Sequence, residues 1–129
     1  MRIIILFLIL HIFDSCKSQD TKIKHIGYLT IVDTLKLSKG IQVNREDYFI
    51  IYNFRKSESE QEIKGSIKKY SDSFSNRFTN YTIYFYKESP IADTNYIKGF
   101  GKEYYYKALL SEKPYAVYFW WLGKFYHKE

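Results

Sequence analysis

The sequence predicts an α+β domain, with one mixed or mostly antiparallel sheet of about five or six strands and one long amphipathic helix packed on a face. Apolar residues recur with the period of a helix over about residues 57–78. Runs that alternate with period two, or that are continuously apolar, lie before and after this stretch. The composition is that of a globular chain, since 46% of the residues are apolar and 26% are charged.

The first half of the domain contains two predicted strands before the helix. Apolar residues alternate over residues 26–37, which indicates a half-buried strand. Residues 41–43 are expected to pair back as a short return after a turn. Residues 48–54 are almost continuously apolar, which favours a strand covered on both faces. The carboxylates of Glu46 and Asp47 then fall in a loop between these segments.

The helix has a clear start signal and a clear apolar stripe. Ser57 and Ser59 each precede a glutamate by three residues, Glu60 and Glu62, so both fit a capping box with serine at the N-cap. Arg77 is expected in the last turn, where the helix dipole favours a cation. The stripe has steps of three and four residues and consists of Ile63, Ile67, Tyr70, Phe74 and Phe78.

More strands are expected after the helix. Residues 80–87 alternate and predict a strand, and residues 104–110 are compatible with either a helix or a strand. Residues 115–122 are expected to form a central strand, with residues 111–114 as a hairpin link to the segment before it. Residues 125–128 predict a last short strand.

The first residues have the pattern of an export signal. Residues 3–13 form an apolar run of about 11 residues, whereas a helix that spans a bilayer needs about 20. The run and its single preceding cation, Arg2, therefore fit the hydrophobic region of a signal peptide. The polar residues that follow, up to residue 24, have the composition of a short tether.

Ser15-Cys16 follows that run directly and resembles the lipobox of bacterial lipoproteins, although Phe13 and Asp14 depart from the usual leucine and small apolar residue. The resemblance implies a signal peptide at residues 1–15, a lipid-anchored tether at residues 16–24 and a single domain at residues 25–129. It also implies a diacylglycerol and a fatty acid such as palmitate on Cys16. Lys17 stands where an aspartate would favour the inner membrane, so the resemblance implies a cell-envelope lipoprotein of the outer membrane, on its periplasmic face or the cell surface.

No catalytic or metal-binding motif is visible in the predicted domain. Cys16 is the single cysteine, which excludes a disulfide, a thiolate zinc site and a cysteine nucleophile within the domain. His25 and His127 lie at opposite ends of the domain without ligand spacing, and we expect both to be exposed. We therefore expect no enzyme, no metal and no cofactor. The net charge of +6 is scattered, which indicates a solvated basic surface rather than a nucleic-acid partner.

Aromatic residues supply the candidate binding surface. About two thirds of the rings in the last two predicted elements are expected in the core, because each buries a large area. The outward side of the last long strand carries either Tyr118 with Trp120 or Phe119 with Trp121. The candidate partner-binding residues are Tyr104, Tyr106, Tyr118, Trp120 and Trp121.

Two functions from different classes fit these observations. The first is a lipid-anchored envelope binding or accessory protein, held to the membrane by its N-terminal lipid, with a protein, peptide or glycan partner. The second is a small membrane-tethered hydrolase that acts on envelope material. A flat aromatic patch favours the first, and a deep pocket with a buried carboxylate favours the second.

Overall fold

The computed structural model describes residues 19–33, 42–92 and 102–128. It contains one five-stranded sheet in the order β1-β2-β3-β4-β5. The elements are β1 (Lys22–Asp33), β2 (Gln42–Tyr52), α2 (Lys56–Phe74), β3 (Asn80–Lys87), α3 (Lys102–Leu110), β4 (Ala116–Trp121) and β5 (Lys124–Lys128). Strands β2 and β3 are parallel and the other neighbours are antiparallel, so the predicted mixed α+β sheet is confirmed.

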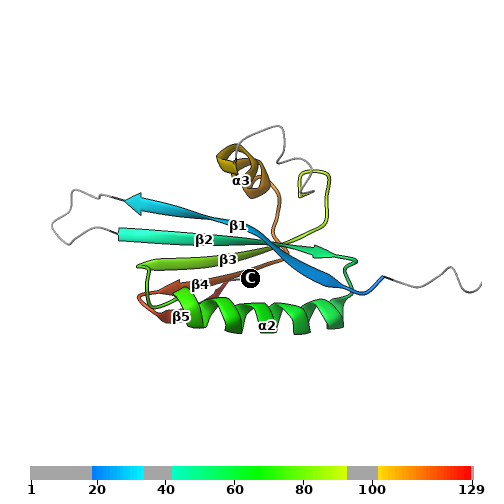
Figure 1. The fold of residues 1–129 in the computed structure, drawn as a ribbon, viewed down its shortest axis with the longest axis horizontal. Helices are drawn as coiled ribbons and strands as arrows, with labels where there is room; N and C mark the ends of the chain where they lie inside the picture. Colours follow the sequence, from blue (N-terminus) through cyan, green and yellow to red (C-terminus); the bar gives the residue numbers. More distant parts are fainter. Residues whose placement is uncertain (1–18, 34–41, 93–101, 129) are drawn as a thin grey trace, which may run out of the picture.

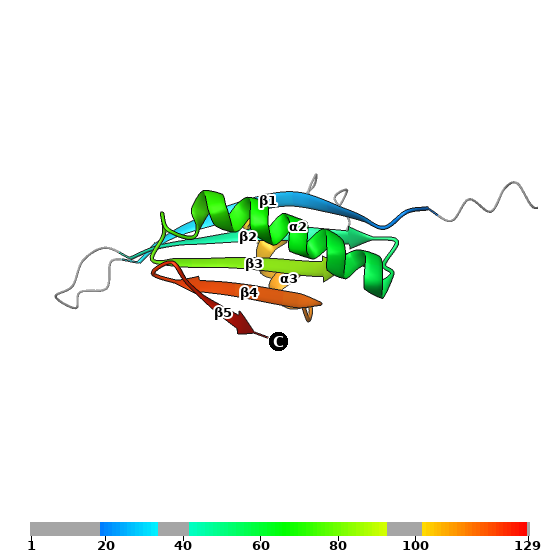
Figure 2. The same ribbon diagram turned by 90° about the horizontal axis from the view of Figure 1, so that it is seen from below.

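The two helices lie on opposite faces of the sheet. Helix α2 connects the parallel strands β2 and β3 and crosses one face, while α3 lies on the other face (Figure 1). Figure 2 shows α2 in front of the strands with α3 behind them. The sheet is therefore the middle layer of three, and it has a core on each side.

Strand β2 contributes to both cores, as its continuous apolar run predicts. Tyr48 and Ile50 face α3, whereas Phe49 and Ile51 face α2, and all four are at most 2% exposed. The core on the α3 side also contains Tyr86, Ala92, Tyr105, Tyr106 and Leu109. The core on the α2 side also contains Ile63, Tyr81, Ile83, Phe85 and Trp120.

Helix α2 begins and ends before its predicted bounds, and the predicted serine cap is wrong. Its N-cap is Arg55, which makes no side-chain capping bond. Ser59 lies one turn before Ile63 on the same side of the helix, so its side chain is buried against the sheet and does not cap. The helix ends at Phe74, so Arg77 lies in the turn that follows rather than in the last helical turn.

The sequence before α2 folds differently from the prediction in one important respect. Residues 42–52 form one continuous strand, so Glu46 and Asp47 lie in the middle of β2 and not in a loop. Strand β1 begins at Lys22, within the segment expected to be a tether, and ends at Asp33. Residues 34–37 of the predicted first strand lie outside the described residues.

Two predictions for the second half are wrong: the hairpin link at residues 111–114 and the central position of the strand at residues 115–122. Strands β3 and β5 occur where they are predicted, but the segment before β4 is helix α3, so no hairpin links it to β4. Tyr105, Tyr106 and Leu109 are buried at helical spacing against the sheet. The central strand is β3, and β4 (Ala116–Trp121) lies between β3 and β5, so the expectation that this segment is the central strand is wrong.

Candidate functional site

The strand register fixes which chain segments meet at each end of the sheet. Val32 pairs with Val43, and Asn80 pairs with both Asn44 and Trp121. The end of β1, the starts of β2 and β3 and the β4–β5 hairpin therefore lie at one end. The start of β1 lies at the other, where Lys22 pairs with Tyr52 (Figure 1).

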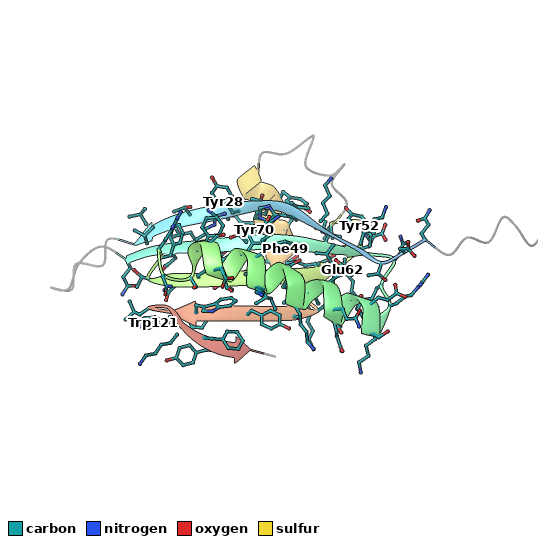
Figure 3. The ribbon with its side chains drawn as sticks, turned by 60° about the horizontal axis from the view of Figure 1, so that its bottom comes forward. Tyr28, Phe49, Tyr52, Glu62, Tyr70 and Trp121 are labelled. Carbon is teal, nitrogen blue, oxygen red and sulfur yellow. The ribbon has the colours of Figure 1, made fainter. Side chains whose placement is uncertain are left out.

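The end with the β4–β5 hairpin exposes a group of large apolar side chains. We call this group the apolar end; it consists of Ile31, Val32, Trp121, Leu122, Phe125 and Tyr126, which are 41–68% exposed. Figure 3 shows Trp121 at this end, far along the sheet from Tyr52. Single exposed apolar residues are ordinary, but Trp121, Leu122, Phe125 and Tyr126 are neighbours on one short hairpin, and a contiguous group of this kind is typical of an interaction site.

The hairpin turn contains the most exposed of these residues. Leu122 and Gly123 form a two-residue turn with φ values of 48° and 76°, the combination that a type I′ turn requires. The amide of Leu122 donates to the carbonyl of Thr79 at 2.9 Å, which joins the turn to the start of β3. A Cβ on Gly123 would overlap the side chain of Asn76, so the turn packs closely against the chain that follows α2.

The structure separates the five candidate binding residues. Tyr106, on α3, is 1% exposed in the core between that helix and the sheet, Trp120 is 6% exposed, and Tyr118 is half-buried against the core on the α2 side. Trp121 is exposed, and the side chain of Tyr104 lies outside the described residues. Of the two sets proposed for β4, Phe119 with Trp121 is therefore the one that contains an exposed ring.

Sequence reasoning missed most of the apolar end. Leu122, Phe125 and Tyr126 carry a signal that is visible in retrospect, because apolar residues occupy a turn position and two successive positions of a short terminal strand. A strand that covers a core on one side is expected to alternate apolar and polar residues, and the successive rings of Phe125 and Tyr126 break that alternation.

A second cluster surrounds Asp47, whose side chain is fully buried. His25 Nε2 donates to Asp47 Oδ1 at 2.7 Å, and Arg45 donates from Nε to Oδ2 at 2.8 Å and from its terminal nitrogen to Oδ1 at 3.1 Å. The guanidinium of Arg45 lies between the rings of Tyr28 and Phe74, at 3.9 and 3.6 Å from their centroids. Figure 3 shows Tyr28 over β1 and the neighbouring Tyr70 on α2.

Electrostatics keeps this carboxylate charged. Burial alone would raise the pKa of Asp47, but the hydrogen bonds from His25 and Arg45 outweigh it and hold the pKa below its usual value. Burial together with the nearby Asp47 charge raises the pKa of Tyr70. His25 is thus a half-buried partner of Asp47 whose ring packs on Phe49 and Tyr70, and the expectation that it is exposed is wrong.

The Asp47 cluster joins β1, β2 and α2. The carboxylate accepts hydrogen bonds from His25 on β1 and Arg45 on β2, and the ring of Phe74 on α2 covers the guanidinium. Within residues 19–33, 42–92 and 102–128, no three histidine, cysteine, aspartate or glutamate side chains come together as a metal site. The side chain of His127 lies outside the described residues.

An open cleft of about 1140 Å³ lies at the start of β4, near the end of the sheet opposite the hairpin. Its walls come from both faces of the sheet, with Glu60 and Lys64 on α2, Tyr84 and Tyr86 on β3, and Phe119 on β4 among them. Among the described residues that line the cleft, the carboxylate is that of Glu60, and it is exposed, whereas a buried carboxylate would favour the hydrolase alternative.

Three comparisons with known proteins bear on identity. The chain matches no protein-family model, no curated protein and no solved structure. In the part of the chain that the structure describes, neither helix has the length and apolar character needed to cross a bilayer.

Proposed function

We propose that the protein is a non-enzymatic binding module of the cell envelope, anchored by lipid on Cys16, which binds a protein partner through its apolar end. The anchor is supported by the resemblance of Ser15-Cys16, after an apolar run, to a lipobox. The binding role is supported by the side chains that the domain exposes at the far end of its sheet.

Leu122 is the observation that carries the proposal. A leucine at positive φ costs about 1–2 kcal/mol relative to glycine, and asparagine or glycine is the usual residue at this position of a type I′ turn. Its side chain is 68% exposed, so no burial within the domain offsets that cost. A strained, exposed apolar residue is expected where a partner covers it.

The aromatic neighbours of Leu122 fit a protein partner. Trp121, Phe125 and Tyr126 surround the turn, and aromatic side chains of this kind supply most of the binding energy at protein interfaces. The rings of Phe125 and Trp120 lie 5.2 Å apart, so the exposed ring is supported from below by a buried one. Support of this kind lowers the entropy lost when the ring is immobilised by a partner.

The test is site-specific photo-crosslinking in the cells that make the protein, with the crosslinker at residue 122 or at residue 110. Leu110 is the matched control, because it is also an exposed leucine but lies at the end of α3. We expect a discrete adduct from residue 122 and none from residue 110. Equal adducts from both positions, or none from either, would contradict the binding role.

The anchor is tested separately with Cys16→Ala. The wild-type chain is expected in the membrane fraction, with lipid on its N-terminal cysteine by mass spectrometry, and the variant in the soluble fraction. A variant that stays in the membrane, together with an unmodified Cys16 in the wild type, would contradict lipid anchoring while leaving the crosslinking result to stand alone.

A further inference from the structure

The two edges of the sheet differ in their capacity to accept another strand. Strand β1 has a register shift between His25 and Gly27. A bulge of this kind interrupts the regular ladder at an edge and hinders the pairing of a further strand. Strand β5 pairs with β4 without interruption from Lys124 to Lys128, and no strand in the described part of the chain pairs with its outer edge.

The hairpin geometry determines which backbone groups of β5 face outward. The two-residue turn closes on the pair Trp121–Lys124, so residues 124, 126 and 128 direct their N–H and C=O groups towards β4. Residues 125 and 127 then direct theirs to the open edge. Phe125 and Tyr126, 53% and 49% exposed, lie on opposite faces of the sheet beside that edge.

We propose that the outer edge of β5 is a site for β-strand addition, at which an extended segment of the protein partner pairs with residues 124–128. This inference rests on the proposed function and specifies how the partner binds. Main-chain hydrogen bonds to residues 125 and 127 supply the pairing, and the exposed rings of Phe125 and Tyr126 gain cover on both faces.

The charge of β5 specifies the sequence of that segment. Residues 124 and 128 are both lysines and occupy register positions of the same parity on β5, four positions apart, with Tyr126 between them. Opposite charges directly across a strand pair are favourable, and like charges are unfavourable. The segment therefore carries two acidic residues four positions apart, with β-branched or aromatic residues between them.

A second copy of this chain fits the edge poorly. If two β5 strands paired antiparallel about Tyr126, Lys124 of each copy would lie opposite Lys128 of the other. Both like-charged pairs would be unfavourable, so the edge favours an acidic segment of a different protein over self-association.

The test uses the purified full chain in dodecyl maltoside micelles and a labelled peptide, Thr-Glu-Val-Tyr-Val-Glu-Thr, with binding measured by fluorescence anisotropy. In the proposed register, both valines pair with residues 125 and 127, while the central tyrosine directs its own N–H away. N-methylation of one valine removes a pairing donor, and N-methylation of the tyrosine is the matched control. We expect the first to weaken binding at least tenfold and the second to leave it within about twofold, since tenfold corresponds to one lost hydrogen bond of ordinary strength.

A second comparison tests the same edge from the protein side. Phe125→Ala removes the ring, whereas Phe125→Pro removes both the ring and an outward N–H that the ladder with β4 does not use. We expect Phe125→Pro to bind the peptide at least tenfold more weakly than Phe125→Ala. Replacing both glutamates of the peptide with lysine is expected to weaken binding about tenfold or more.

The outcomes separate this inference from the proposed function. If both N-methylated peptides bind alike, or if the lysine peptide binds as tightly as the acidic one, strand addition at β5 is wrong. Crosslinking from residue 122 in cells would then still support a partner at the apolar end. If residue 122 gives no adduct, the proposed function fails independently of the peptide result.

Discussion

Replacement of Asp47 by leucine is expected to be among the most damaging single substitutions in the domain. The carboxylate is fully buried and accepts hydrogen bonds from His25 and from two nitrogens of Arg45. The Asp47→Leu variant leaves the Arg45 guanidinium, whose residue is 9% exposed, without its counter-charge. Loss of one partner from a buried ion pair costs about 3–5 kcal/mol, a large fraction of the stability of a domain.

The matched control removes both charges. In Arg45→Met/Asp47→Leu, the site between the rings of Tyr28 and Phe74 becomes apolar and no charge remains buried without a partner. Apolar replacement of a whole buried ion pair is often close to neutral, so we expect the double variant to be more stable than Asp47→Leu alone. The comparison therefore isolates the uncompensated charge from the change of shape.

The assay is equilibrium unfolding in urea, followed by the fluorescence of Trp120 and Trp121. With a slope of about 2 kcal/mol per molar urea, a loss of about 4 kcal/mol lowers the midpoint by about 2 M. A loss below about 1 kcal/mol for Asp47→Leu, or a double variant less stable than the single one, would show that the cluster does not hold the strands and α2 together as described.

Three other expectations follow from the same contacts. Folding lowers the pKa of Asp47, so the carboxylate stabilises the domain above the unfolded pKa of about 4, and this stabilisation is lost as the pH falls through the lower folded pKa. The Asp47→Asn variant has no carboxylate to protonate. Its urea midpoint should therefore fall less than that of the wild type when the pH is lowered below about 4. Gly27 has a φ of 147°, and the Cβ of Gly27→Ala would overlap the hydroxyl of Tyr106, so we expect the free energy of unfolding to fall by at least about 2 kcal/mol. A smaller loss, or no partial recovery of stability when Tyr106→Phe is added, would contradict this contact. Leu122→Asn should stabilise the domain by about 0.5–1 kcal/mol in thermal unfolding while weakening partner binding, because asparagine adopts positive φ readily; a destabilised variant would mean that Leu122 serves the fold instead.

The elements that could be predicted from the sequence are those in which one buried face sets the spacing of the apolar residues. The stripe that includes Ile63, Ile67 and Tyr70 required a helix, and the alternation in residues 80–87 required a strand. The same rule explains why the cap was placed wrongly. Ser59 occupies the stripe as well as the capping pattern, and burial against the sheet prevailed over capping.

The errors occur where long-range contacts determine the local structure. Residues 44–47 are all polar, so in isolation they indicate a turn. In the fold, Asp47 is paired with His25, which is 22 positions away, and Arg45 is covered by rings from β1 and α2. No local pattern records His25 or these rings as partners, and therefore neither the strand at residues 44–47 nor the burial of its charges could be predicted from this sequence alone.

Helix α3 illustrates a different limit. Tyr104, Tyr105 and Tyr106 are compatible with a strand by propensity, since aromatic residues favour sheets. The helix is stabilised by its tertiary contacts: Tyr106 lies 4.5 Å from the ring of Tyr48, and Leu109 completes the buried side one turn later. Aromatic abundance thus indicated how much surface would be buried but not which rings would remain exposed.

The positions of the two ends of the sheet bear on where the proposed binding site would lie relative to the membrane. Strand β1 has 12 residues and spans about 40 Å, from the residues nearest Cys16 to the apolar end. The chain between Cys16 and Lys22 adds at most about 3.5 Å per residue, or about 20 Å in all. If Cys16 bears lipid and β1 stands along the membrane normal, Leu122 would lie about 40–60 Å from the membrane surface. In that orientation the apolar end would meet a partner that projects into the envelope and not the lipid, which is the setting in which an exposed, strained leucine and an open edge strand are useful.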